Sequence, residues 1–275
     1  MTAIQITNLT HDYGSGKGVF DLSLQINPGE TFGFLGPNGA GKTTTIRHLL
    51  GFIKPQQGQC SILGLDCWNQ SVQIQRNLGY LPGEISFFDD MTGLEYLSFL
   101  QQYRGLSKAK TRTQELLDRF DVNPKPKLKK MSKGMKQKIG IVAAFMHDPN
   151  ILILDEPTSG LDPLMQNRFI ELLNEEKKRN KTILMSSHMF DEVERTCDRI
   201  GIIRKGHLVA LEDTNVLRAQ HVKSYTASFK SPAIAQNFAK DFQGVIDPMD
   251  NTKVTVTAKQ TLEQIFLDYY GGNAE

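Results

Sequence analysis

The first 35 residues carry the hydrophobic pattern of β-strands. Apolar and polar residues alternate over residues 4–9 and again over residues 19–26, which predicts two strands that each bury one face. Residues 27–29, Asn-Pro-Gly, have the composition of a turn. Residues 31–35 are almost entirely apolar, which is typical of a strand buried on both faces. We therefore expect three strands ahead of the first helix.

Strands and helices alternate in the pattern that follows. A glycine-rich turn leads into a predicted helix at about residues 42–50, which Gly51 ends. Apolar residues at helical spacing predict that residues 71–147 are mostly helical. This alternation indicates an α/β fold with a mostly parallel sheet, an antiparallel β part and a helical subdomain at about 71–147. Further strands are expected at residues 151–154, 182–187, 200–204 and 208–211, the last two as a hairpin.

The pattern changes beyond residue 220. Residues 224–229 and 253–257 have the composition of strands, and residues 233–242 that of a helix, which predicts a small α+β appendage of βαβ type. We therefore expect two domains, residues 1–220 and residues 221–275. The second domain carries no recognisable chemistry and is interpreted as a packing or regulatory module.

Composition places the chain among ordinary globular proteins. Its 275 residues are 39% hydrophobic and 23% charged, which excludes disordered, collagenous and disulfide-scaffold classes. A net charge of +2 gives no indication of a strongly charged partner. The three cysteines, at positions 60, 67 and 197, lack metal-ligand spacing and are interpreted as reduced structural thiols.

The apolar runs are too short for a membrane span. Residues 139–146 form one of the longest, whereas about 18 apolar residues are needed to cross a bilayer. The N-terminal residues lack the pattern of a secretory signal. We therefore expect a soluble chain whose membrane role, if it has one, comes through a partner.

Residues 36–43 form the strongest motif, Gly-Pro-Asn-Gly-Ala-Gly-Lys-Thr, which matches the phosphate-binding loop G-x-x-x-x-G-K-[ST]. Glycines at 39 and 41 let successive backbone N–H groups face phosphate oxygens, and the following helix points its positive dipole end at the same anion. Lys42 adds a point charge for the β- and γ-phosphates, and Thr43 offers a hydroxyl to Mg²⁺. The predicted phosphate-binding residues are Gly36, Pro37, Asn38, Gly39, Ala40, Gly41, Lys42, Thr43 and Thr44.

Two carboxylates and a histidine follow later buried strands. Asp155 and Glu156 end the apolar run 151–154, and His188 follows the strand at 182–187. Ligands of open parallel sheets bind at the carboxyl ends of the strands, so these side chains are expected beside the phosphate-binding loop. Asp155 would hold Mg²⁺, Glu156 would polarise the water that attacks the γ-phosphate, and His188 would contact that phosphate.

Together these motifs resemble the ATP-binding subunit of an ABC transporter, a P-loop NTPase. Residues 131–135, Met-Ser-Lys-Gly-Met, resemble a variant of the LSGGQ signature of that family, and residues 159–162 match its D-loop. His188 matches the family's switch histidine, and Tyr13 matches the aromatic residue that stacks on adenine. The ordered set spans residues 4–211, which is most of the chain.

The resemblance implies an ATPase that works as a dimer with ATP and Mg²⁺ as cofactors. Two subunits pack head to tail, so that Ser132, Gly134 and Asp162 of one subunit face the ATP on the loop of the other. ATP closes the dimer and hydrolysis opens it, which drives integral-membrane transporter subunits. The implied location is the cytoplasmic face of the cell membrane, as a peripheral subunit, with a homodimer as the expected pair.

The sequence departs from the family pattern at two places. Lys133 replaces the first glycine of the signature and Met135 its glutamine, while Ser132 and Gly134, the residues that the resemblance places on phosphate, remain. The family's Q-loop glutamine would follow residues 80–82, where this chain has Gly83 and then Glu84. Glu84 is a candidate substitute as a contact to Mg²⁺ or water.

Further segments bear on partners. Residues 261–267 are similar to the tail of drug-resistance exporter ATPases, and residues 85–88, with two aromatics, are expected to dock a membrane subunit. The basic run at 124–130 could attract anionic headgroups or nucleic acid, but no interleaved aromatics support base stacking, so no specific nucleic acid is expected.

Two alternatives to a transport ATPase stay open at this point. One is a non-transport ABC ATPase that acts on ribosomes or nucleic acid, although the second cassette or coiled-coil insertion usual in such proteins is absent from the sequence. The other is a regulatory nucleotide-binding module with negligible turnover, which the altered signature and Gly83 would favour.

Overall fold

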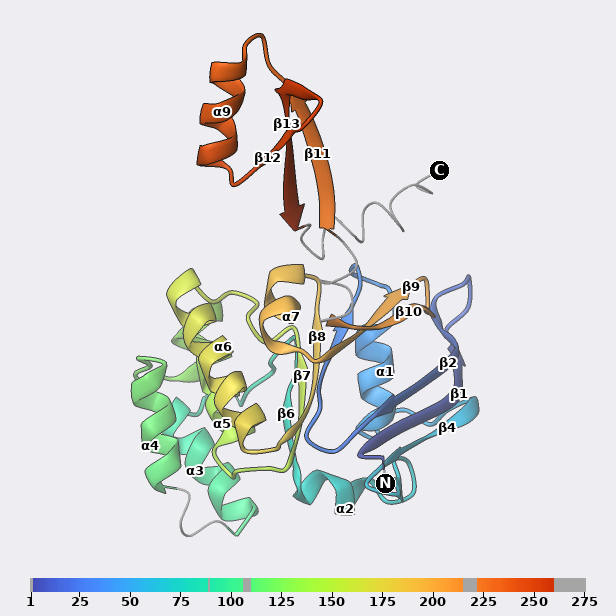
Figure 1. Cartoon of the computed structure of the whole chain (residues 1–275). Coiled ribbons are helices and arrows are strands. Elements are labelled where there is room, and N and C mark those ends of the chain that lie inside the picture. The colour runs from blue at the N-terminus through green and yellow to red at the C-terminus, as the bar shows by residue number, and fades with distance from the viewer. Residues whose placement is uncertain (1, 89, 106–109, 215–221, 260–275) are drawn as a thin grey trace. The chain divides into compact units, whose positions relative to one another are not determined.

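The computed structural model describes residues 2–88, 90–105, 110–214 and 222–259 (Figure 1). The chain divides into two compact units, Met1–Glu212 and Asp213–Glu275. The boundary lies a few residues ahead of the position expected from the sequence pattern. The predicted tail motif at 261–267 lies outside the described residues.

A four-stranded sheet in the order β2-β1-β4-β5 forms one layer of the first unit. Both β1–β2 and β1–β4 pairs are antiparallel, with Ile4 opposite Ile26 and Ile62. The strands β4 and β5 had no clear signal in the sequence, because β4 begins with polar residues and β5 is two residues long. The strands are β1 (Ile4–Asp12), β2 (Gly18–Ile26), β4 (Gln57–Ile62) and β5 (Leu65–Asp66).

A six-stranded sheet in the order β10-β9-β3-β8-β7-β6 forms the second layer. Its pairs β9–β3, β3–β8, β8–β7 and β7–β6 are parallel, which confirms the predicted α/β fold. Every residue of β3, β7 and β8 is buried, as the near-continuous apolar runs predict. The strands are β3 (Thr31–Leu35), β6 (Leu78–Leu81), β7 (Ile151–Asp155), β8 (Thr182–Ser187), β9 (Arg199–Arg204) and β10 (His207–Asp213).

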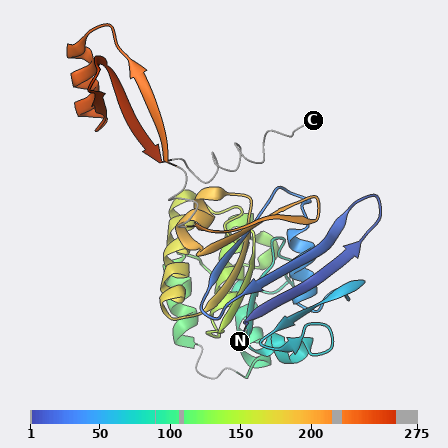
Figure 2. The ribbon, with the colours of Figure 1, turned by 45° about the vertical axis from the view of Figure 1, so that its right-hand side comes forward.

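The helix α1 (Lys42–Leu49) lies between the two sheets, because it contacts β2 and β4 on one side and β7 on the other. Figures 1 and 2 agree that β1, β2 and β4 form a layer apart from β6, β7 and β8. Ile46 and Leu49 are fully buried in the core that the two sheets share. The turn of residues 36–41 connects the end of β3 to the start of α1, and both of these elements are anchored in the core.

The first helix of the segment predicted as mostly helical, α2 (Ser71–Arg76), begins where expected, but β6 then interrupts the pattern at 71–147 with a strand of the central sheet. Within residues 71–147 the longest described helix, α5, packs against α3, α4 and β6. Thr92 caps α3 and forms a reciprocal capping box with Glu95. Besides α1, the α-helices described in this unit are α2 (Ser71–Arg76), α3 (Gly93–Tyr103), α4 (Lys110–Arg119), α5 (Lys133–Phe145), α6 (Pro163–Lys178) and α7 (Phe190–Thr196).

A buried ion pair ties α4 to α6. Glu176 is 3% exposed, and its carboxylate lies 2.5 Å from Arg112 and 3.0 Å from Arg179. Arg112 also donates to the carbonyl of Phe145 at the end of α5. A carboxylate so deeply buried is tolerated because two guanidinium groups hydrogen-bond to it, and together these contacts join α4 to α6 and to the end of α5.

In its described residues 222–259, the second unit is a three-stranded antiparallel sheet in the order β11-β13-β12 with one helix. The order of the elements is the predicted one, strand then helix then strand. The two predicted strands pair antiparallel, and a short third strand, which was not predicted, pairs with the second of them. Ala235 and Ala239 of the helix pack on Val254. The elements are β11 (Val222–Ser228), α9 (Pro232–Asp241), β12 (Val245–Asp247) and β13 (Asp250–Lys259).

Two expectations from composition concern thiols and membrane spans. The three cysteines are free and buried, and burial raises the pKa of both Cys60 and Cys197 to about 12. Among the helices that the structure describes, none combines the length and the apolar character needed to cross a membrane.

We expect Glu176→Ala to lower the free energy of unfolding by about 1.5–3 kcal/mol, because it removes the charge-assisted hydrogen bonds of a buried carboxylate to two guanidinium groups. The matched control is Glu175→Ala. Glu175 pairs with Arg119, but its side chain is 56% exposed, so its loss should cost under about 1 kcal/mol. Urea unfolding of the two variants measures the difference, and equal costs would contradict the role of the buried pair.

Candidate functional site

Three adjacent strands of the central sheet end at the same edge. The order β3-β8-β7 and the parallel register set Leu35 opposite Ser187, and Asp155 opposite Ser186. The segments that follow these strands are the phosphate-binding loop, the pair Asp155 and Glu156, and His188. The structure therefore brings together the three motifs that the sequence predicts at this edge.

The phosphate-binding loop is a tight turn between β3 and α1. Gly39 and Gly41 adopt left-handed backbone angles, with φ of 79° and 113°. At Gly41 a Cβ atom would also lie 2.8 Å from a methyl group of Val19, so a larger residue is excluded twice. The helix α1 begins directly after Gly41, and its first backbone N–H groups are free of helical partners. This arrangement is a binding site for an anion such as a phosphate.

Lys42 is a buried cation at the base of the loop. It is 5% exposed, and its Nζ donates to the carbonyls of Gly36 and Pro37 at 2.5 and 3.2 Å. The same Nζ lies 3.2 Å from Oε1 of Glu156. The ammonium group thus lies between the loop and the acidic strand end, and can attract a phosphate that enters the loop.

Asp155 is held by two hydroxyl groups. Thr43 donates to Oδ2 at 2.8 Å, and Ser186 donates to Oδ1 at 2.5 Å. The aspartate is 2% exposed, so these bonds compensate for the burial of its polar oxygens. The contact between Thr43 and Asp155 joins two of the three residues that the sequence indicates for a metal ion, the third being Glu84.

Glu156 begins the loop after β7 with a strained backbone. Its φ is 49°, and its N–H donates to Oγ and to the carbonyl oxygen of Ser186 at 3.1 and 3.2 Å. In this conformation the carboxylate lies between the side chains of His188 and Lys42. Its Oε2 is 2.5 Å from Nδ1 of His188, and its Oε1 faces Nζ of Lys42. A carboxylate so placed can accept a proton from a water molecule beside the loop.

A cleft of about 700 Å³ opens over these groups. Pro37 to Thr44 line it, together with Asp155, Glu156 and His188, and Tyr13 stands at its rim, 53% exposed. Gly36 lies beneath the loop instead, where a Cβ atom would be 2.4 Å from the carbonyl oxygen of Ile203. Lys17 and Arg47 also line the cleft, two cations that the sequence motifs do not identify.

Tyr80 and residues 82–84 form another wall of the cleft. Glu84 lines it beside Gly83, whose Cβ, if present, would be 3.4 Å from both the carbonyl oxygen and Oδ2 of Asp155. These distances are ordinary van der Waals contacts, so the space at position 83 does not by itself require glycine. Burial, reinforced by the charge of Asp155, raises the pKa of Tyr80 to about 12, so its hydroxyl stays protonated.

The signature segment is packed on the loop that follows Glu156. Ser132 caps α5 and accepts from the N–H of Met135 at 3.2 Å, and Nζ of Lys133 donates to Oγ of Ser159 at 3.0 Å. The backbone at Gly134 approaches the carbonyl oxygen of Gly160, where a Cβ would be only 2.7 Å away. Among the described residues that line the cleft, Lys133 is present, but Ser132, Gly134 and Asp162 are not.

Three further polar residues support the site although no motif contains them. Ser186 binds Asp155 and the backbone of Glu156, and Gln137 of α5 donates to the carbonyl oxygen of Pro157 at 2.7 Å. Glu192 of α7 accepts from Ser187 at 2.6 Å, and burial raises the pKa of its carboxyl group. In the sequence, these three residues stand out only as polar residues at positions that the hydrophobic pattern predicts to be buried.

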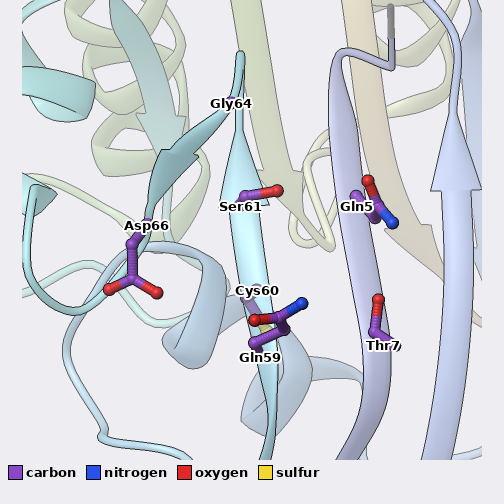
Figure 3. Close-up of a pocket in the computed structure, with 7 residues that line it drawn as sticks. All are labelled: Gln5, Thr7, Gln59, Cys60, Ser61, Gly64 and Asp66. Carbon is purple, nitrogen blue, oxygen red and sulfur yellow. The ribbon is translucent and has the colours of Figure 1, made fainter.

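A second hollow of about 240 Å³ lies on the antiparallel sheet (Figure 3). Gln5 and Thr7 of β1 face it, and so do Gln59 and Ser61 of β4. Asp66 is the one carboxylate among its seven lining residues, so this hollow lacks the paired acid and base groups of the cleft.

The comparisons with known proteins agree with one another. The family described as ABC transporter matches residues 19–159. The bacitracin transport ATP-binding protein BcrA of Bacillus licheniformis is 42% identical over 211 residues, which cover 76% of this chain and 69% of that protein. The linearmycin resistance ATP-binding protein LnrL of Bacillus subtilis (strain 168) is 37% identical over 212 residues, which cover 76% and 68%.

Solved structures share the fold. A structure titled as the ATP-binding subunit of an ABC transporter matches with a TM-score of 0.74 and 33% identity, over 80% of this chain and 93% of that chain. A dimeric ATP-binding cassette in a post-hydrolysis state with ADP and Pi matches with a TM-score of 0.69 and 21% identity, over 77% and 98%.

Proposed function

The chain belongs to the ABC transporter family as an ATP-binding subunit with ATPase activity, and on this premise we propose which of its residues bind ATP, hydrolyse it and transmit the result. The observation that carries the assignment is the carboxylate of Glu156 held between Lys42 and His188 beside the phosphate-binding loop. The direct test is Mg²⁺-dependent ATP hydrolysis by the chain together with its membrane partner.

ATP binds in the cleft over the loop. The N–H groups of the loop and the start of α1 surround the phosphates, while Tyr13 at the rim stacks on the adenine. The oxygens of Thr43 and Asp155, 2.8 Å apart, form a hard donor set that fits Mg²⁺, and Glu84 can add a carboxylate. Bound Mg²⁺ would supply positive charge to the phosphate oxygens.

Hydrolysis depends on three side chains. Glu156 accepts a proton from the attacking water, and His188 orients the Glu156 carboxylate and reaches the γ-phosphate. Lys42, freed from the loop carbonyls, stabilises the negative charge that develops on the phosphate oxygens.

A second subunit completes each site. Ser132, Gly134 and Asp162 lie outside the lining of their own cleft, so they are available to the ATP of a partner copy. The N-terminus of α5 supplies N–H groups and a positive dipole end for a γ-phosphate. We therefore assign Ser132, Gly134 and Asp162 to the interface of a head-to-tail homodimer, which closes when ATP binds.

The membrane subunit docks on the aromatic surface formed by Phe88, Phe99 and Tyr103. All three side chains are exposed, and their rings follow one another with centroids 6.0 and 6.3 Å apart. An exposed aromatic cluster of this kind is typical of a protein interface. Relatives named for bacitracin transport, linearmycin resistance and Nod factor export favour an exporter, with this subunit peripheral at the cytoplasmic face of the membrane.

The nucleic-acid alternative has less support from the structure. Lys129 of the basic run lies 2.6 Å from Asp90, and Lys127 lies 4.0 Å from it, so part of the positive charge is already compensated. Salt-sensitive binding of RNA or DNA through this run would favour that alternative. ATP binding without turnover in the presence of the membrane partner would favour a regulatory module.

We expect Lys42→Ala to weaken ATP binding by about 10- to 100-fold, because it removes charge-assisted bonds of about 1.5–3 kcal/mol to the phosphates. Titration of a fluorescent ATP analogue measures the affinity. Lys178→Ala, which removes an exposed lysine at the end of α6, is the control and should bind ATP like the wild type. Unchanged affinity in Lys42→Ala would contradict the proposed site.

Glu156→Gln should lower kcat by about 100-fold or more, because the amide cannot accept the proton of the attacking water. The binding site remains, so ATP should accumulate in a closed dimer. Light scattering after gel filtration, with and without MgATP, measures the mass of the variant. A variant that stays monomeric at saturating MgATP, with the membrane subunit supplied, would contradict the dimer mechanism.

The double substitution Phe88→Ala and Phe99→Ala should lower affinity for the membrane subunit by about tenfold or more, since each buried aromatic contact contributes on the order of 1 kcal/mol or more to an interface. The ATP affinity should not change. Phe242→Ala removes an equally exposed aromatic from the second unit as a control. Co-purification with the membrane subunit provides the measurement, and undiminished recovery of the double variant would locate the docking surface elsewhere.

A further inference from the structure

Glu192 is a buried carboxyl group that the proposed mechanism does not use. It lies in the first turn of α7 and is 4% exposed, and Ser187 donates to its Oε2 at 2.6 Å. Ser187 is the last residue of β8 and immediately precedes His188. The carboxyl group therefore acts on the residue next to the histidine of the site.

The hydroxyl of Ser187 also fixes the backbone on the other side of His188. Its Oγ accepts from the N–H of Met189 at 3.0 Å. A serine hydroxyl has a single hydrogen to donate and two lone pairs. That hydrogen has two acceptors within reach, Oε2 of Glu192 at 2.6 Å and the carbonyl oxygen of Met189 at 3.4 Å, and the much shorter contact assigns it to Glu192. A lone pair then stays directed at the N–H of Met189, and the turn of residues 187–189 is held around His188.

The same serine is tied to the phosphate-binding loop through its backbone. The N–H of Gly36 donates to the carbonyl oxygen of Ser187 at 3.3 Å, at the point where β3 and β8 end side by side. With this carbonyl held by the loop and the hydroxyl held by Glu192, the main chain at 187 is fixed on two sides. His188 then points at Glu156, with Nδ1 2.5 Å from Oε2.

The surroundings of Glu192 show that burial of this carboxyl group is costly. Burial raises its pKa, and the nearby charge of Glu156 acts in the same direction, while the hydroxyls of Ser187 and Thr158 and the charge of His188 oppose the shift. An apolar residue of similar size would avoid the cost of desolvation. A polar acceptor at this position therefore points to a requirement of the site.

We propose that Glu192 is a positioning residue, which through the Ser187 hydroxyl holds His188 in contact with Glu156. The proposal rests on the proposed roles of His188 and Glu156 in hydrolysis. Glu192 touches neither substrate nor water in this assignment. Its contribution is the hydrogen-bond acceptor, which orients the turn that carries the histidine.

Kinetics of three variants test the acceptor. Glu192→Leu keeps a similar volume without an acceptor, and we expect kcat to fall by about tenfold or more with KM within about twofold, because misplaced catalytic groups slow the chemical step. Glu192→Gln keeps an oxygen acceptor for Ser187 and should retain kcat within about threefold. Asp191→Asn, which removes an exposed carboxylate from the same helical turn, is the control and should match the wild type.

A double-mutant cycle tests the route through Ser187. Ser187→Ala should lower kcat about as much as Glu192→Leu, and the double variant should be no more than about twofold slower than either. Multiplicative losses in the double variant would overturn the proposal, as would a Glu192→Gln variant as slow as Glu192→Leu. Thermal unfolding of each variant is measured alongside, and a loss of kcat that tracks a lowered Tm and a raised KM would also overturn it.

A spectroscopic measurement separates this proposal from the proposed function. The imidazole resonances of His188, identified by their absence in His188→Ala, should shift in Glu192→Leu and in Ser187→Ala and stay in place in Asp191→Asn. This readout needs no turnover. An inactive wild type whose His188 resonances respond in this way would refute the proposed function and keep the positioning role, whereas unmoved resonances in an active wild type would refute the positioning role alone.

Discussion

Parallel pairing of β3, β8 and β7 is the constraint on which the site depends. Because the three strands run in the same direction, their carboxyl ends meet at one edge, and the register sets Asp155 beside Ser186 and Leu35 beside Ser187. Each strand ends in a polar segment that would be costly to bury alone. At the shared edge these segments satisfy one another, as Asp155 does with the hydroxyls of Thr43 and Ser186.

The interior of the sheet is apolar and its edge is polar, because the strands are buried and meet at one edge. The strands are buried along their whole length, so their apolar residues supply the core, and their polar residues are confined to the ends. A positive φ at Glu156 stores some strain in the backbone, which the two bonds from its N–H to Ser186 offset. Because the buried strands hold their ends in place, the side chains that line the cleft are held in fixed positions.

The helical part reaches the same loop from another side. Gln137 and Lys133 of α5 bind the segment after Glu156, at Pro157 and Ser159. The buried ion pair of Glu176 with Arg112 links α4 to α6, which follows that segment in the chain. A movement of α5 would therefore shift the backbone next to Glu156, the carboxylate that we propose as the proton acceptor. Because α3 packs against α5, this connection is a physical route between the proposed docking surface and the cleft.

The sequence by itself determined the elements whose physics is local. The glycine-rich turn between β3 and α1 follows from its own residues, since its glycines and the lysine act within a single turn. The apolar runs 31–35 and 151–154 predict buried strands, which the structure shows as β3 and β7, the latter one residue longer. Tertiary structure alone decided what depends on neighbours distant in the chain. The short strands β4, β5 and β6 exist because partners pair with them, and β6 interrupts a segment whose spacing favours helix. Likewise, no spacing rule indicates that Glu192 accepts from Ser187 or that Glu156 lies between Lys42 and His188, because hydrogen bonds between separate elements are set only when the strands have packed.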